Sequence, residues 1–214
     1  MWYTFIKRGE IVVETYTIGG FQTNTYIISN DKNECIIIDP SLDFKSIYTL
    51  IDNKYTVKAI LLTHGHLDHI DGCRYFKDVP VYIYKSEEKV MYDSHLSLYE
   101  IIGKKTPYQK GDLWVMPVVD NQEFNLIGYN IRVIHTPGHT EGSCCYYING
   151  DLFTGDTLFY CTCGRTDFPT GNSTKIVHSI KKLVNEFPEE TVVYPGHDRA
   201  TTIKNEKNNN FVIR

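Results

Sequence analysis

One short segment, THGHLDH at residues 63–69, constrains this chain more than any other part of its sequence. It follows an apolar run and places His64, His66, Asp68 and His69 within six residues. Alternate residues of an extended segment point to the same side, so the first two histidines can contact one ion. Asp68 and His69 follow a turn and can face a second ion. Imidazole and carboxylate groups suit zinc, iron or manganese. The alternative is a capped helix start with surface histidines, but the density of these residues favours a metal site.

Length and composition are typical of a globular protein. The 214 residues are 42% hydrophobic and 22% charged, which predicts one domain over residues 1–214 with ample chain for a core. A formal charge of −4 argues against a nucleic-acid partner. We find no apolar stretch long enough for a membrane span or a signal peptide, so we expect a cytoplasmic protein. The six cysteines form no C-x-x-C pair, and we expect reduced, structural thiols.

Short apolar runs alternate with turn residues and a few helical patterns. Helical spacing predicts helices at 44–51, 86–92 and 173–187, the last being the clearest. Residues 93–115 are interpreted as helix fragments and loop, and 205–210 as a polar turn. Strands mixed with helices, in two similar halves, predict two sheets packed face to face with helices outside. We expect strands at 11–17, 25–28, 35–38, 57–62, 81–84, 131–135, 144–148, 151–154 and 192–194.

An apolar strand, a turn and a metal-competent side chain recur three more times along the chain. Predicted strands end just before His139, Asp156 and His197, and glycines nearby let the backbone turn tightly. Each occurrence is weak alone, but four such junctions together indicate one site at the strand ends. The remaining histidines are expected to have structural roles or none: His95, His135 and His178.

These segments, in this order, resemble the metallo-β-lactamase superfamily. The matching elements are His64-x-His66-x-Asp68-His69, Gly138-His139-Thr140, Gly155-Asp156 and Pro195-Gly196-His197. The resemblance implies a four-layer αββα sandwich in the α/β class, with a dinuclear centre at one edge. It implies two divalent ions, with zinc as the first candidate and iron or manganese as alternatives. One ion would be held by His64, His66 and His139, and the other by Asp68, His69 and His197, with Asp156 bridging the two.

Within the superfamily, the chain looks most like the hydroxyacylglutathione hydrolase (glyoxalase II) group, and especially its short single-domain members. The telling segments are Gly155–Phe159 and Cys163-Gly164-Arg165. The resemblance implies that Arg165 contacts a glutathione carboxylate, with a surface salt bridge as the alternative. Asp167 and Arg199 stand where the group has aromatic residues. Full-length members carry a C-terminal helical domain, whereas this sequence continues seventeen residues past His197.

The resemblance therefore implies hydrolysis of a small thioester such as S-D-lactoylglutathione. A hydroxide made available at the two ions would attack the carbonyl, and Asp68 would be both a ligand and the group that orients the nucleophile. One alternative is a persulfide dioxygenase with a single iron held by His64, His139 and Asp156. Others are a lactonase with the same ligands and a metal-stabilised binding protein without turnover. β-Lactamases normally lack a histidine at the position of His69, which disfavours that activity.

Overall fold

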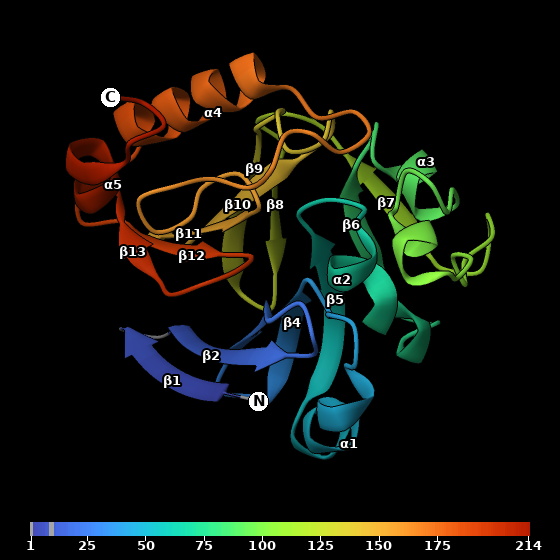
Figure 1. Ribbon diagram of the computed structural model, residues 1–214. Helices are drawn as coiled ribbons and strands as arrows, with labels where there is room; N and C mark the ends of the chain where they lie inside the picture. Colours follow the sequence, from blue (N-terminus) through green and yellow to red (C-terminus); the bar gives the residue numbers. More distant parts are fainter. Residues whose placement is uncertain (1, 9–10) are drawn as a thin grey trace.

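The computed structural model describes residues 2–8 and 11–214, which form two mixed β-sheets with helices on their outer faces (Figure 1). The first sheet has seven strands that lie side by side in sequence order. The first four pair antiparallel, and those from β4 to β7 pair parallel. Its strands are β1 (Trp2–Arg8), β2 (Ile11–Ile18), β3 (Thr23–Ser29), β4 (Glu34–Ile38), β5 (Thr56–Leu62), β6 (Val81–Tyr84) and β7 (Val115–Val118).

The second sheet has six strands in the order β13-β12-β11-β10-β9-β8. All its neighbours pair antiparallel except β11 and β12, which are parallel. Parallel strands end at the same edge of a sheet, so the loops after β11 and β12 lie together. The strands are β8 (Glu123–Leu126), β9 (Tyr129–His135), β10 (Cys144–Ile148), β11 (Asp151–Gly155), β12 (Val192–Pro195) and β13 (Thr201–Thr202).

Apolar side chains fill the space between the two sheets. Ile28 and Ile36 of the first sheet belong to the same buried cluster as Val133, Tyr146 and Phe153 of the second. Successive side chains of a strand point to opposite faces, so the remaining apolar residues are left for the outer faces. These outer faces are covered by helices, which completes the four layers.

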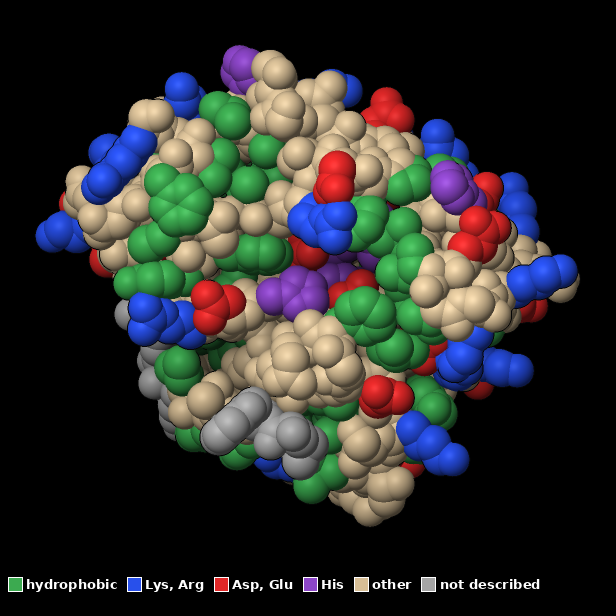
Figure 2. Space-filling model, viewed as in Figure 1, with side chains coloured by type: hydrophobic (Ala, Val, Ile, Leu, Met, Phe, Trp, Pro, Cys, Tyr) green, Lys and Arg blue, Asp and Glu red, His purple; other side chains and the backbone are tan. Residues whose placement is uncertain are grey.

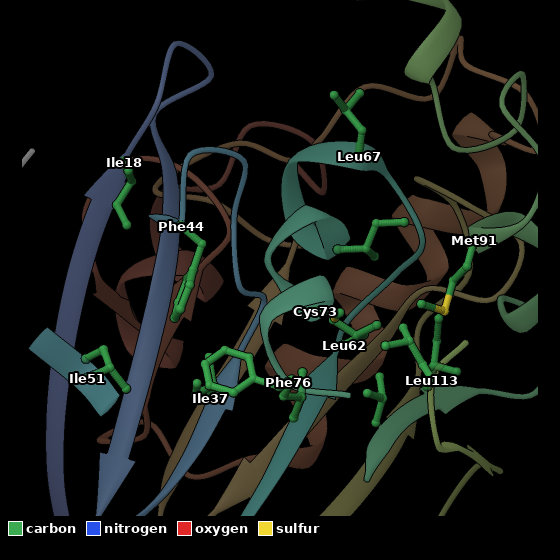
Figure 3. Close-up of a cluster of buried hydrophobic side chains, with 14 of the residues drawn as sticks. Ile18, Ile37, Phe44, Ile51, Leu62, Leu67, Cys73, Phe76, Met91 and Leu113 are labelled. Atoms are coloured by element: carbon green, nitrogen blue, oxygen red, sulfur yellow. The ribbon is translucent and has the colours of Figure 1, made fainter. Parts of the chain in front are cut away.

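The helices cover two separate outer clusters. On the first sheet, Ile51 of α1 (Lys45–Lys54) and Leu67 of α2 (Leu67–Ile70) join Phe44 and Leu62 in one core (Figure 3). On the second sheet, α4 (Ser173–Glu186) buries Ile176, Ile180 and Leu183. Shorter elements complete the described chain: η1 (Asp71–Tyr75), α3 (Glu88–Met91), η2 (Tyr99–Ile102) and α5 (Ile203–Asn209). No helix of the described residues is long and apolar enough to cross a membrane.

The αββα arrangement and the helix at 173–187 confirm the sequence predictions, whereas the polar turn expected at 205–210 was wrong. That segment lies mostly in α5, which is capped by Thr202, whose side chain accepts a hydrogen bond from the Asn205 backbone amide. Its buried face carries Glu206, which accepts hydrogen bonds from the Cys161 amide and the Thr201 hydroxyl. A helix that buries a carboxylate lacks the apolar stripe on which the prediction depended.

Candidate metal centre

The HGHLDH motif begins in the turn that follows β5 and continues into α2. Gly65 passes beneath α3 so closely that a Cβ at this position would lie 2.7 Å from Val90 Cγ1. Only glycine permits this approach, and the rings of its neighbours His64 and His66 converge on one side. α2 then places Asp68 and His69 against the same space, and both side chains are largely buried.

His64, His66 and His139 form the first set of candidate ligands. His64 Nε2 lies 3.1 Å from His66 Nδ1, and His139 Nε2 lies 2.9 Å from the same His66 nitrogen. His139 comes from the loop between β9 and β10, so the second sheet contributes one of the three rings. The three ring nitrogens lie within 4.8 Å of one another, which is close enough for one ion to contact all three.

Asp68, His69 and His197 form the second set, with ligand atoms also within 4.8 Å. Asp68 Oδ2 lies 3.5 Å from His69 Nε2 and 3.4 Å from His197 Nε2. Asp156 lies between the two sets. Its Oδ2 atom is 3.4 Å from His139 Nε2 and 3.5 Å from His197 Nε2. The structure therefore brings together all seven side chains that the sequence singled out.

Hydrogen bonds at the far nitrogens fix the orientation of most of these rings. His64 Nδ1 lies 3.1 Å from Thr63 Oγ1, and His69 Nδ1 lies 2.9 Å from Asp39 Oδ2. His139 Nδ1 lies 2.6 Å from the Arg165 carbonyl oxygen. His197 Nδ1 is 3.1 Å from the carbonyl oxygen of Phe21. Such outer contacts select the ring tautomer and orient the inner nitrogen toward the position of a metal ion.

Sequence reasoning missed Asp39, although the signal was present. It directly follows β4, so it repeats the pattern of an apolar strand followed by a metal-competent residue. Its carboxylate accepts hydrogen bonds from both the amide and the hydroxyl of Thr63, at 2.8 and 2.7 Å. Asp39 therefore supports the turn that carries His64 and also orients the His69 ring.

The three other histidines lie outside the centre. The His135 ring stacks on Tyr84 and its Nε2 atom lies 2.9 Å from the Glu141 carbonyl oxygen. His95 is exposed and contacts Glu100, while His178 is exposed on α4. These placements confirm the structural or surface roles expected from the sequence.

Electrostatics divide the two sets of histidines. Burial and neighbouring imidazoles lower the pKa of His64 far below its usual value and that of His66 to about 3. Burial also opposes the charged form of His69 and His197, but Asp68 and Asp156 outweigh it. The carboxylates raise the pKa of His69 to about 9 and that of His197 to about 11. The histidines of the first set are therefore neutral and can donate lone pairs. The two histidines of the second set lie beside two carboxylates, Asp68 and Asp156.

The donor atoms fit a pair of divalent ions. His69 Nε2 and Asp156 Oδ1 are buried without a hydrogen-bond partner, yet they face each other at 3.4 Å. Burial raises the pKa of Asp156, but His197, His69 and His139 lower it well below its usual range. Buried polar atoms are costly when they lack partners, and a cation between a carboxylate and an imidazole nitrogen satisfies both. The mixture of nitrogen and oxygen donors suits zinc, iron or manganese.

A pocket of about 490 Å³ opens directly onto these residues. Figure 2 shows histidine side chains at the bottom of a hollow bordered by hydrophobic side chains. His66, Asp68, His139, Asp156 and His197 all line the pocket. The apolar part of its wall consists of Phe21, Leu67, Leu98, Ile101, Phe159 and Phe168. A small molecule with an apolar portion can therefore lie against the wall while a polar group reaches the ligand cluster.

Arg165 also lines the pocket, but its guanidinium is engaged with a neighbour. Nε and Nη2 donate to the two carboxylate oxygens of Asp167 at 2.9 and 2.6 Å. The same guanidinium lies over the Phe168 ring, 4.4 Å from its centroid. Both members of the ion pair are about 65% exposed. The structure thus places Arg165 at the pocket rim and shows the surface salt bridge that was its alternative role.

Two mixed sheets flanked by helices, with a histidine and aspartate cluster at one edge, define a metallo-hydrolase fold. The chain belongs to the metallo-beta-lactamase superfamily, whose profile matches residues 18–197.

Three curated relatives are similar along most of the chain. The probable metallo-hydrolase YqgX of Bacillus subtilis is 34% identical, covering 90% of this chain and 93% of its own length. The hydroxyacylglutathione hydrolase GloC of Haemophilus influenzae is 30% identical, covering 92% of this chain and 96% of its own. A hydroxyacylglutathione hydrolase of Yersinia pestis is 32% identical over 85% of this chain but only 64% of its own length. The chain is therefore similar in extent to the short relatives.

Three solved structures share the fold. The BLEG-1 B3 metallo-beta-lactamase has a TM-score of 0.84 and 32% identity, covering 94% of this chain and 99% of its own. TTHA1623 in a di-iron-bound form has a TM-score of 0.78 and 29% identity, covering 92% of this chain and 98% of its own. ETHE1 from Myxococcus xanthus has a TM-score of 0.69 and 25% identity, covering 100% of this chain and 85% of its own. These neighbours share one architecture, although one is described as a metallo-beta-lactamase and another as a di-iron-bound form.

Proposed function

We propose that the chain is a hydrolase of small thioesters with two divalent metal ions, and that its substrates include S-D-lactoylglutathione. The convergence of two three-residue sets, with Asp156 between them, carries this proposal. The likeness to GloC of Haemophilus influenzae supports the substrate class. Zinc is the first candidate for both ions, with iron and manganese as alternatives. The cytoplasmic location expected from the sequence stays a prediction.

His64, His66 and His139 would hold one ion, Asp68, His69 and His197 would hold the other, and Asp156 would bridge them. When bound, the two ions would supply a hydrolytic nucleophile at neutral pH and polarise the carbonyl that it attacks. Asp68 would orient that nucleophile, because its carboxylate lines the pocket and is fixed by a 2.7 Å hydrogen bond from Thr23 Oγ1. Burial raises the pKa of Asp68, but His69 and His197 outweigh it, so the group stays an anion.

The pocket wall would bind the remainder of the substrate. Leu98 and Ile101 come from the segment around η2, and Phe168 faces them from the loop after Arg165. The apolar side chains would exclude water from the acyl group. Arg165 would hold a carboxylate of the thiol, and that carboxylate must displace Asp167 from the guanidinium. Asp167 would therefore weaken binding of anionic thiols relative to neutral ones.

The decisive experiment combines metal analysis with a substrate panel on protein purified without chelator. We expect two ions per chain, hydrolysis of S-D-lactoylglutathione that a chelator abolishes, and little or no hydrolysis of β-lactams. The likeness to the BLEG-1 structure makes the β-lactam arm necessary. If metal-replete protein hydrolyses lactones or β-lactams but no thioester, the proposed substrate class is wrong.

A second candidate is a persulfide dioxygenase with one iron held by His64, His139 and Asp156. The likeness to ETHE1, a persulfide dioxygenase, favours this candidate. The second ligand set around His69 and His197 favours two ions instead. Oxygen consumption with glutathione persulfide, together with one iron per chain and no thioester hydrolysis, would replace the first proposal with this one.

A further inference from the structure

Glu87 is a buried carboxylate that the sequence gave no reason to single out. It lies between β6 and α3, and only 1% of its surface is exposed. Its two carboxylate oxygens have different partners. Oε2 accepts a hydrogen bond from the Gly65 amide at 2.9 Å, and Oε1 accepts one from the Gly142 amide, also at 2.9 Å.

Both partners lie in loops that carry candidate ligands. Gly65 stands between His64 and His66, and Gly142 lies three residues after His139. The first loop follows β5 of one sheet, and the second joins β9 and β10 of the other. The two partners are 22 and 55 residues from Glu87 in the sequence. One side chain thus connects the two loops that together form the three-histidine set.

The backbone at both contacts is shaped around this side chain. A Cβ at Gly142 would lie 2.6 Å from Glu87 Cγ, and one at Gly65 would lie 3.2 Å from its Oε2. Neither glycine has a positive φ, so glycine is required here for close approach and not for an unusual backbone conformation. A backbone hydrogen bond from the Cys144 amide, at the start of β10, to the Thr63 carbonyl at 2.9 Å also joins the two segments. That bond fixes the bases of the loops, whereas Glu87 holds them beside the ligands.

We infer that Glu87 is a positioning residue that sets the separation of the His64–His66 turn and the His139 loop, and thereby tunes metal affinity at the three-histidine set. The inference rests on the metal-binding part of the proposed function. Its two hydrogen bonds reach Gly65 and Gly142, whereas the second set lies in α2 (Asp68 and His69) and after β12 (His197). Loss of Glu87 should therefore weaken binding of the ion at the three-histidine set and leave binding of the other ion nearly unchanged. Residues that orient ligands typically contribute about 10–100-fold to metal affinity.

The two sets can be tested separately in paired backgrounds. His197→Ala removes a ligand from the second set, and His139→Ala removes one from the first. Glu87→Gln is introduced into each background, because the amide keeps the shape but turns an NH₂ group toward one backbone N–H. Zinc affinity is measured by competition with a chromophoric chelator. We expect Glu87→Gln to lower zinc affinity by about tenfold or more in the His197→Ala background and by less than about threefold in the other.

Glu88→Gln provides the matched control, since it makes the same chemical change one residue further along, at a half-buried position. It should leave zinc affinity unchanged in both backgrounds. The melting temperature of each metal-free variant shows whether the fold survives. Should Glu87→Gln fail to fold, Glu87→Asp keeps the charge and both acceptor oxygens on a shorter stem, and it should show the same selective loss.

The outcomes separate this inference from the proposed function. Equal losses in the two backgrounds would mean that Glu87 only stabilises the fold, and no loss in the His197→Ala background would overturn the positioning role. Either result leaves the wild-type metal content and thioester hydrolysis intact. Wild-type protein that binds no metal would instead overturn the proposed function itself.

Discussion

The ligand cluster and the rim of the pocket next to it are built in opposite ways. His64, His66 and His69 are at most 2% exposed, and four of the five histidines of the cluster have a hydrogen bond at the far ring nitrogen. At the rim, Ile101 is 58% exposed and the Arg165 side chain 65%. The cluster is buried and held by hydrogen bonds from segments of both sheets, whereas these rim side chains are mostly exposed to solvent. We therefore expect the reaction class to depend on the buried cluster, and the choice of substrate to depend on rim residues that can change without disturbing that cluster.

Removing Asp156, the carboxylate that we propose bridges the two ions, should have the largest effect on the buried side of this comparison. Asp156 contacts His69, His139 and His197, so Asp156→Ala should disturb both ions. We expect kcat/KM to fall on the order of a thousandfold and elemental analysis to recover less than one ion per chain. Asp52→Ala, on the exposed side of α1, is the control and should retain both ions. Two tightly bound ions in Asp156→Ala would show that the carboxylate does not bridge.

The sequence was enough to single out the candidate ligands, because each group of them comes after an apolar strand and this local pattern is visible in the sequence. Asp39 has the same pattern and was still missed, because a single aspartate before a proline is more often a turn residue. Glu87 could not be found in this way. Its partners are backbone amides 22 and 55 residues away, and no side-chain pattern encodes such a contact. For α5, the buried Glu206 hid the helix for a related reason.

Asp39, which contacts candidate ligands from outside the cluster, should show a smaller effect in the same buried region. Asp39 orients His69 and bonds twice to Thr63, so Asp39→Asn should lower the affinity for metal by about 10–100-fold. Activity at saturating zinc should recover in large part, because every ligand is still present. Zinc titration of activity measures both effects. An unchanged titration midpoint would mean that the His69 ring is held by packing alone.

At the rim, Arg165→Ala should change substrate binding without changing the metal. We expect KM for S-D-lactoylglutathione to rise about tenfold with kcat nearly constant, since loss of uniform binding acts on KM. Metal content should equal that of the wild type. Lysine at this position should recover part of the loss, because it keeps the charge but not the guanidinium fork. If KM does not change, the natural thiol carries no carboxylate that Arg165 binds.

The smallest expected effect comes from the partner of that arginine. Asp167 occupies both donors of the Arg165 fork, so a substrate carboxylate must compete with it. Exposed ion pairs are weak, and Asp167→Asn should therefore lower KM for S-D-lactoylglutathione by only about two- to fivefold. A neutral thioester without a carboxylate should bind the wild type and the variant equally, which separates competition from a general change of the loop. In the Arg165→Ala background, Asp167→Asn should have no effect on KM, because no guanidinium remains to be released. An equal gain for neutral and anionic substrates would show that Asp167 acts on the shape of the rim and not on its charge.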